Sequence, residues 1–278
     1  MMMKPISTTP SLADIPVIIL CGGQGTRLRE ETEFIPKPMV DIGGRPILWH
    51  IMKHYYQAGV RNFYLCLGYK GGIIKNYFLD YRYRDINLSI DFSHHGPVRG
   101  SGVEFLDERK IEDWRVNLIE TGADSQTASR ISRVLPYLKN QTFFVTYGDG
   151  LSNVDLHALL QCHQSGGRLA TLTAVRPSSR FGELKLEDGK VTNFQEKPQI
   201  SAGWINGGFQ VFERAAFDTV DTSRDNVVLE TDVLQQLAED HQLSVYEHDG
   251  FWQAMDTYRE TQMLRDMWAK GHSPWKTW

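Results

Sequence analysis

The chain has 278 residues, of which 41% are hydrophobic and 23% are charged, the composition of an ordinary globular protein. Its formal net charge of −4 offers no basic surface for a polyanion, so we expect no nucleic-acid partner. The sequence contains no run of about 18 apolar residues, so we expect no membrane partner either.

The first two thirds of the chain alternate between strand-like and helix-like patterns. Residues 1–14 are polar and rich in Ser, Thr and Pro, and we predict a disordered leader there. Short apolar runs predict strands at 15–20, 62–67, 116–120, 143–147 and 169–175, and helical spacing predicts helices at 46–58, 71–81, 125–138 and around His157. This alternation predicts an α/β fold, with a Rossmann-like, mostly parallel sheet and helices on both of its faces.

The pattern changes beyond residue 180. Asp188-Gly189 separates the alternating runs 183–186 and 191–194, which predicts a β-hairpin. A strand at 209–212, a helix at 229–239, a strand at 243–247 and a final helix from about 256 to 268 are predicted to follow. We interpret 15–278 as a single domain with a small antiparallel lobe.

One glycine-rich loop carries the strongest functional signal. Leu20-Cys21-Gly22-Gly23-Gln24-Gly25-Thr26-Arg27-Leu28 follows the first predicted strand, and Pro36-Lys37-Pro38 comes soon after it. Backbone amides without side chains can surround phosphate oxygens, and the Arg27 guanidinium can donate two hydrogen bonds to the same phosphate. Two prolines stiffen the backbone of Lys37. This combination favours an enzyme that stabilises a polyphosphate during transfer over a simple strand-to-loop turn.

Common nucleotide-binding motifs do not fit this loop. A dinucleotide fingerprint needs a third glycine where Leu28 stands, which counts against a nicotinamide-dependent oxidoreductase. The Gly-x4-Gly-Lys-Ser/Thr string of a P-loop does not occur in the sequence.

Other residues are candidates with competing explanations. Asp149 lies between two glycines after an apolar run, where it could hold Mg²⁺ or simply form a turn. Local sequence favours Asp256 as the cap of the last helix. Lys197 could clamp a phosphate or be solvated, and Asn206-Gly207-Gly208 could bind sugar hydroxyls or form a bulge.

The three cysteines are widely spaced along the chain. We expect Cys21, Cys66 and Cys162 to be reduced core residues of a cytoplasmic protein.

Several of these motifs occur together and in order. Gly22-Gly-Gln-Gly-Thr-Arg-Leu, Pro36-Lys-Pro-Met, Gly148-Asp-Gly, Phe194-Gln-Glu-Lys-Pro and Asn206-Gly-Gly resemble the sugar-1-phosphate nucleotidyltransferases over residues 17–278. Gly250-Phe-Trp-Gln and the terminal Pro274-Trp-Lys-Thr-Trp are most similar to the cytidylyltransferase branch of that family. That branch uses CTP and α-D-glucose 1-phosphate as its substrates.

The resemblance implies a role for each matched residue. It implies a nucleotide-binding half over about 15–150 and a sugar-phosphate half over about 151–278. The implied nucleotide contacts are Leu20, Cys21, Gly22, Gly23, Gln24, Gly25, Thr26, Arg27, Lys37, Ser125, Arg130 and Gly148, and the implied sugar-phosphate contacts are Glu196, Lys197, Asn206 and Gly207. Asp149 and Asp256 match the family's Mg²⁺ ligands, which reverses the local interpretation of Asp256.

The implied reaction is an Mg²⁺-assisted in-line attack in which Arg27, Lys37, Asp149 and Lys197 are the catalytic residues. A phosphate monoester has a second pKa of about 6, so the sugar phosphate is already an anionic nucleophile near pH 7 and needs no general base. The resemblance also implies a cytoplasmic homo-oligomer, of which a hexamer is one form it allows, and a place in the synthesis of CDP-linked sugars for surface polysaccharide.

The chain departs from the family pattern in one loop. Ala128-Ser129 replaces two usual glycines, and Ser125 stands where threonine is expected. The same chemistry with UTP or dTTP therefore stays open as an alternative. A catalytically silent sensor of nucleotide sugars is the other alternative, although a sensor has no need for the charges of Arg27, Lys37 and Lys197.

Overall fold

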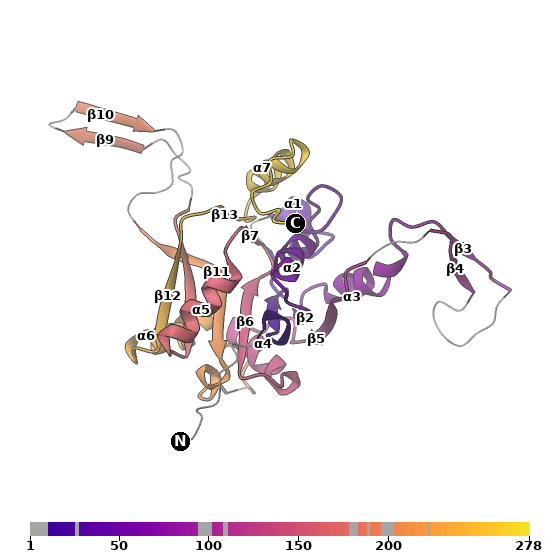
Figure 1. Ribbon diagram of the computed structural model, residues 1–278, viewed down its shortest axis with the longest axis horizontal. Helices are drawn as coiled ribbons and strands as arrows, with labels where there is room; N and C mark the ends of the chain where they lie inside the picture. The colour runs from indigo at the N-terminus through magenta and orange to yellow at the C-terminus, as the bar shows by residue number, and fades with distance from the viewer. Residues whose placement is uncertain are drawn as a thin grey trace, which may run out of the picture.

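A seven-stranded sheet forms the centre of the molecule (Figure 1). The computed structural model describes residues 11–25, 28–93, 102–107, 111–177, 183–187, 190–195, 203–221 and 223–278. The strands lie in the order β12 (Leu243–His248), β8 (Ala170–Val175), β11 (Ile205–Glu213), β6 (Thr142–Tyr147), β1 (Val17–Leu20), β2 (Asn62–Leu67) and β5 (Arg115–Glu120). Only β11 runs antiparallel to its neighbours, which confirms the expected mostly parallel sheet.

In the part of the chain that the structure describes, three antiparallel strand pairs lie outside this sheet. They are β9 (Glu183–Glu187) with β10 (Lys190–Gln195), β7 (Gly150–Ser152) with β13 (Trp252–Ala254), and β3 (Leu88–Ile90) with β4 (Val103–Phe105). The β9–β10 pair confirms the hairpin predicted from Asp188-Gly189. In Figure 1 it extends away from the sheet, as does the β3–β4 pair on the opposite side.

Helices cover both faces of the sheet, as predicted. They are α1 (Arg29–Thr32), α2 (Ile47–Gln57), α3 (Gly71–Leu79), α4 (Thr127–Val134), α5 (Leu156–Gly166), α6 (Gln235–Glu239) and α7 (Tyr258–Ala269). Among the residues that the structure describes, no helix is long and apolar enough to cross a membrane.

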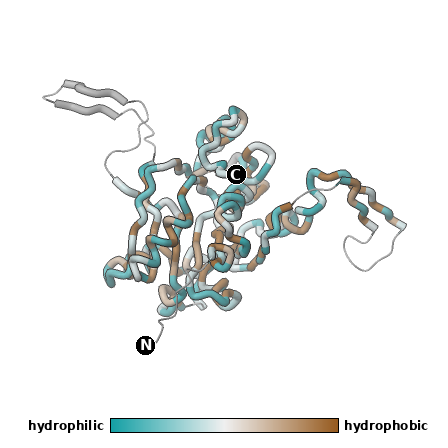
Figure 2. The backbone as a smooth tube through the Cα atoms, in the orientation of Figure 1, coloured by the Kyte–Doolittle hydropathy of each residue, from teal (hydrophilic) through white to brown (hydrophobic). Residues whose placement is uncertain are grey.

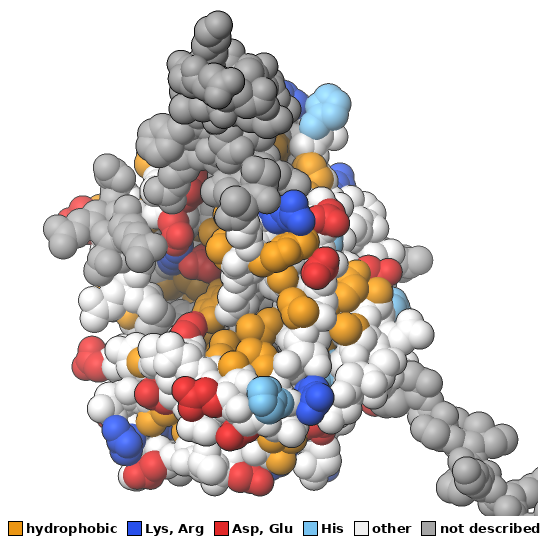
Figure 3. Space-filling view, turned by 90° about the vertical axis from the view of Figure 1, so that its left-hand side faces the viewer, with side chains coloured by type: hydrophobic (Ala, Val, Ile, Leu, Met, Phe, Trp, Pro, Cys, Tyr) orange, Lys and Arg blue, Asp and Glu red, His pale blue; other side chains and the backbone are white. Residues whose placement is uncertain are grey.

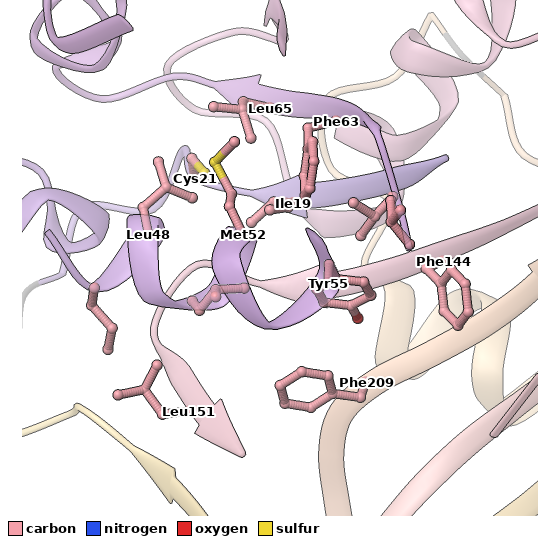
Figure 4. Packing of buried hydrophobic residues seen from close by; sticks show 14 of the residues in the cluster. Ile19, Cys21, Leu48, Met52, Tyr55, Phe63, Leu65, Phe144, Leu151 and Phe209 are labelled. Carbon is pink, nitrogen blue, oxygen red and sulfur yellow. The ribbon is translucent and has the colours of Figure 1, made fainter. Parts of the chain in front are cut away.

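Alternation along β1 explains the two layers. Val17 and Ile19 join a buried cluster with residues of α2 and α5, whereas Ile18 and Leu20 join a second cluster with residues of α4. Figure 4 shows Met52 of α2 beside Ile19 in the first cluster. Figure 2 shows hydrophobic residues along the central strands, in keeping with a sheet that is covered on both faces.

Several predicted boundaries shift in the structure. Leu12–Asp14, expected within the leader, form a 3₁₀ turn in which Leu12 is only 3% exposed, so described core packing starts before residue 15. The helix predicted at 125–138 is α4 followed by a 3₁₀ turn at Leu135–Tyr137. The helix predicted at 229–239 begins as the π-helix Leu229–Leu234.

The strand β11 is longer than predicted and lies in the middle of the main sheet. It includes Gly207 and Gly208, where the register with β8 shifts and forms a bulge. Gly208 adopts φ +83°, and an added Cβ would lie 2.5 Å from the ring of Tyr147, so glycine is required there.

Candidate active site

The glycine loop after β1 lies at the carboxyl edge of the parallel strands. Backbone bonds tie it to both neighbouring strands: Cys21 donates to Cys66 O, and Gly148 donates to Leu20 O. A Cβ on Gly22 would lie 2.1 Å from the Arg130 guanidinium, so any other residue here would force that guanidinium out of its hydrogen bonds. The loop therefore brings bare backbone to the place where open α/β sheets bind their ligands.

Lys37 joins two carboxylates from distant parts of the chain. Its Nζ lies 2.6 Å from Asp149 Oδ2, which follows β6, and 2.6 Å from Asp256 Oδ1, which follows β13. The pairing of β7 with β13, together with the bond from Met255 N to Asp149 O, brings the two aspartates together. Burial lowers the pKa of Lys37, but the charge of Asp149 and the hydrogen bonds to both aspartates outweigh burial and raise that pKa above its ordinary value.

Asp256 does not cap the last helix, so the local interpretation of that residue was wrong. Thr257 is the N-cap of α7, and its hydroxyl accepts from Glu260 N. The Glu260 carboxylate in turn accepts from the backbone N–H groups of Asp256 and Thr257. The capping box therefore anchors the backbone of Asp256 while its carboxylate accepts from Lys37.

The donor set at this point fits Mg²⁺. Asp149 and Asp256 present hard carboxylate oxygens toward one point, and their side chains are 30% and 31% exposed. Among the described residues, no group of three or more His, Cys, Asp and Glu could hold a metal ion. Mg²⁺ in phosphoryl-transfer sites typically takes only one or two carboxylates and completes its shell with substrate phosphates and water. The pair is therefore suited to a metal that binds together with a phosphorylated substrate.

Two adjoining cavities meet at Asp149. The first has a volume of about 240 Å³ and is lined by the glycine loop, Lys37, Pro38, the start of α4 and Tyr147-Gly148-Asp149. The second has a volume of about 190 Å³ and is lined by Thr146, Tyr147, Asp149, Gly150, Asn206, Gly207, Trp252, Ala254 and Asp256. Tyr147 and Asp149 belong to both walls, so a group bound in one cavity can meet a group bound in the other beside the carboxylate pair.

Arg130 holds together the loops that form the first cavity. Its side chain is buried, and its guanidinium donates to Gly22 O, Leu67 O, Thr121 Oγ1, Gly122 O and Ala123 O. These acceptors follow or end three strands, β1, β2 and β5. We expected a nucleotide contact at Arg130, and the structure adds a positioning role because the guanidinium fixes the backbone of the cavity wall.

The departure from the family pattern at Ala128-Ser129 is accommodated by the segment 225–227. Ala128 N and Ser129 N both donate to Val227 O, and Ser129 Oγ accepts from Val227 N. Ser125 Oγ donates to Asp225 Oδ1, and Gln126 N donates to Asp225 O. This segment therefore satisfies the first N–H groups of α4, and the added Ser129 hydroxyl holds the segment to the helix through Val227 N.

The expected sugar-phosphate residues Asn206 and Gly207 lie in the second cavity. Asn206 Oδ1 accepts from Gly208 N and from Gln210 Nε2, which closes the β11 bulge. Gly207 O accepts from Trp252 Nε1 at 2.7 Å. The bulge alternative is confirmed, and it places the backbone of β11 against the cavity.

Four expected site residues, Thr26, Arg27, Glu196 and Lys197, lie outside the described residues. Sequence reasoning missed Tyr147, Thr127 and Trp252 as wall residues. Tyr147 OH donates to Glu230, which also accepts from Thr127 Oγ1 at 3.1 Å, so this chain of bonds links the two cavities to α4. For Tyr147, the signal that could have found it is its position at the end of a strand, directly before Gly148-Asp149.

Two of the three cysteines are buried, Cys66 within β2 and Cys21 directly after β1. Cys21 and Cys66 are buried and free, and burial raises the pKa of Cys66 to about 12. Cys162 is half-buried and its thiol lies against Val245 O. The expectation of core cysteines thus holds for Cys21 and Cys66 but not fully for Cys162.

A larger hollow lies at the other end of the sheet. It measures about 520 Å³ and is lined by residues of β8, β12 and the start of β11, such as Leu172 and Val245, and by Trp204 just before β11. Figure 3 shows hydrophobic side chains gathered in a hollow on this face. None of its described lining residues is a carboxylate, unlike the lining of the two cavities beside Lys37.

The chain belongs to the nucleotidyl transferase family, whose pattern it matches over residues 16–260. The fold agrees with this. The chain superposes on HddC from Yersinia pseudotuberculosis with a TM-score of 0.63 at 22% identity, covering 91% of this chain and 99% of that one. It also superposes on a putative glucose-1-phosphate thymidylyltransferase from Bacillus anthracis with a TM-score of 0.64 at 16% identity, covering 91% and 94%.

Two curated relatives narrow the comparison within the family. The chain is 45% identical over 262 residues to a glucose-1-phosphate cytidylyltransferase from Salmonella typhi, covering 94% of this chain and 98% of that protein. It is 46% identical over 261 residues to a probable glucose-1-phosphate cytidylyltransferase from Bacillus subtilis, covering 94% and 99%. The chain is a nucleotidyltransferase that is similar to these enzymes over nearly its whole length.

Proposed function

We propose that the enzyme transfers a cytidylyl group from CTP to α-D-glucose 1-phosphate and releases CDP-glucose and pyrophosphate. The observation that carries the proposal is the meeting of Lys37, Asp149 and Asp256 where two cavities adjoin. Identity of 45% to a relative of that named activity supports the choice of substrates.

The chain's own residues align two anions and neutralise their charge. We assign the nucleotide to the cavity at the glycine loop, whose bare backbone can approach a triphosphate, and the sugar phosphate to the cavity at Asn206 and Gly207. Lys37 lines the first cavity, where its ammonium can stabilise charge that develops toward the pyrophosphate leaving group. From the sequence, we assign Arg27 to the same leaving group, and Glu196 and Lys197 to the sugar phosphate.

The nucleophile needs no base from the protein. The second pKa of a sugar phosphate is about 6, so one of its oxygens carries the charge needed for attack near pH 7. The protein's task is then to hold that oxygen in line with the α-phosphorus, as in other phosphoryl-type transfers. We propose Asp149 and Asp256 as ligands of Mg²⁺, which when bound would neutralise charge on the reacting phosphates.

We extend the proposal to the setting of the enzyme. Its nucleotide substrate and its free thiols Cys21, Cys66 and Cys162 favour a cytoplasmic location. The exposed Phe92, Phe105 and Leu106 at the β3–β4 pair favour burial against another subunit, in a homo-oligomer. The product then serves reactions that build CDP-linked sugars for surface polysaccharide.

Nucleotide preference is tested by pyrophosphate release from purified protein with α-D-glucose 1-phosphate and Mg²⁺, comparing CTP, UTP, dTTP, ATP and GTP. Release with CTP well above the others is expected. Release with UTP or dTTP instead would move the specificity and leave the reaction in place. No release with any nucleotide would contradict the proposed activity and favour a silent sensor.

A further inference from the structure

The Lys37 ammonium lies at the point between two carboxylates that a bridging cation would also take. Its Nζ is 2.6 Å from Asp149 Oδ2 and 2.6 Å from Asp256 Oδ1. The Lys37 side chain is 12% exposed, whereas the two aspartates are 30% and 31% exposed. The ammonium is thus more deeply enclosed than either of its partners, and all three groups share one small volume.

The two carboxylates are attached to firmly held backbone. Asp149 O accepts from Met255 N across the β7–β13 pair, and Asp256 N donates to the Glu260 carboxylate of the α7 capping box. The backbone of Lys37 is also held, because Met39 N and Val40 N donate to Pro36 O and Lys37 O. Only the four-carbon stem of Lys37 can move the ammonium without breaking backbone bonds.

Lys37 also has a second place to go. It lines the first cavity, together with the glycine loop and Gly148, whereas Asp256 lines the second. A triphosphate in the first cavity would offer the ammonium a new anionic partner on that side. An ammonium and a divalent cation on one carboxylate pair oppose each other's binding, because like charges a few ångströms apart repel strongly away from bulk water.

We propose that the Lys37 ammonium and a divalent cation compete for the Asp149–Asp256 pair, so that metal binding requires Lys37 to swing toward the nucleotide cavity. This inference rests on the proposed function, since it takes the cation and the triphosphate as ligands of this site. The competition means that the divalent cation binds weakly when no nucleotide is present. It also makes metal and triphosphate bind cooperatively, since each favours the same position of Lys37, and such coupling is reciprocal.

The first test measures Mn²⁺ binding to chelator-treated protein without nucleotide, by titration followed by electron paramagnetic resonance. Lys37→Met keeps the side-chain length and removes the charge, and Lys37→Gln serves as a second variant if the first folds poorly. The matched control is Lys53→Met, because Lys53 is similarly enclosed but pairs with Glu112. We expect Mn²⁺ to bind about tenfold or more tightly to the Lys37 variants than to the wild type, with no change in Lys53→Met. Equal or weaker binding by the Lys37 variants would overturn the competition.

A second test uses the wild-type protein alone. An amine-acylating reagent is applied with and without saturating Mg²⁺, and labelling of each lysine is quantified by mass spectrometry. Displacement of Lys37 predicts severalfold faster labelling of that residue with Mg²⁺ and an unchanged rate at Lys53. An unchanged rate at Lys37 would overturn the proposal.

These outcomes are separate from the fate of the proposed function. Pyrophosphate release by the wild type with CTP, combined with equal Mn²⁺ affinity in all variants, would keep the function and overturn the competition. Tighter Mn²⁺ binding by the Lys37 variants, combined with no pyrophosphate from any nucleotide, would support the competition and contradict the function.

Discussion

Replacing Arg130 by lysine tests whether this residue holds the cavity wall or only contacts the nucleotide. Its guanidinium donates to Gly22 O, Leu67 O, Thr121 Oγ1, Gly122 O and Ala123 O over distances of 2.7 to 3.2 Å. A lysine ammonium has three donors on one nitrogen, so at least two of the five bonds from the guanidinium are lost, although Leu67 O keeps its bonds from Thr121 and Gly22 O keeps its bond from Tyr69 N. The substitution keeps the charge and changes only the geometry of donation.

The expected cost follows from the burial of these groups. A hydrogen bond to a charged group contributes about 1.5–3 kcal/mol, so the loss of two such bonds in Arg130→Lys should destabilise the fold by roughly 3 kcal/mol. For a chain of this size that corresponds to a fall in Tm of about 6–12 °C. The assay is thermal unfolding without nucleotide, together with the KM for CTP, which should rise because the loops that line the first cavity are less firmly held.

The control is Arg61→Lys. Arg61 NH1 donates to the backbone carbonyls of Tyr56 and Val60, but its side chain is 39% exposed, so water can replace those bonds. We expect a change of less than about 1 kcal/mol there. If Arg130→Lys unfolds within a few degrees of the control and only its KM is raised, the positioning role is refuted and a direct nucleotide contact remains.

Four further outcomes are expected. Lys37→Ala should lower kcat by about a hundredfold or more in the pyrophosphate assay, and an unchanged kcat would remove Lys37 from the mechanism. Asp149→Asn should abolish Mg²⁺-dependent turnover while thermal unfolding stays cooperative, so wild-type activity would refute the metal assignment. Ser129→Gly removes the acceptor of Val227 N and adds a helical glycine, which should cost about 1–3 kcal/mol in urea unfolding; an unshifted midpoint would contradict this. Burial lowers the pKa of His54 to about 4, so the unfolded chain takes up the proton at higher pH than the folded chain does, and the free energy of unfolding falls as pH drops from about 6.5 toward 4. His54→Gln should reduce the stability lost between pH 7 and pH 5 by about 2 kcal/mol. A pH profile of stability identical to that of the wild type would argue against this.

Local patterns were enough to predict the buried strands and the layers. A strand at 62–67 was predicted from an apolar run, and β2 has the same bounds. Five of its six residues are buried, so the apolar run and the buried strand coincide. The helix predicted at 46–58 is α2, which begins after Pro46 and ends before Gly59. In both elements the apolar residues are the ones buried in the core, so the local pattern of apolar residues was enough to predict them.

The centre of the site was harder to predict because it depends on contacts far apart in the chain. The strands β7 and β13 have three residues each, too few for a periodic signal, yet their pairing brings Asp149 to Asp256. At Asp256 the local rule selected the wrong cap. Thr257 with Glu260 three residues later was a capping-box signal that local reading could have used.

The most direct test of the account follows both products with the wild type and three variants. Purified protein is mixed with CTP, α-D-glucose 1-phosphate and Mg²⁺, and CDP-glucose and pyrophosphate are quantified by ³¹P NMR. The account predicts that the wild type and Lys53→Met each form CDP-glucose and pyrophosphate in equal amounts and at similar rates. It predicts about a hundredth of that rate or less from Lys37→Ala, and no product above background from Asp149→Asn. Full product formation by either of the last two would contradict the claim that the Lys37–Asp149–Asp256 junction carries the reaction.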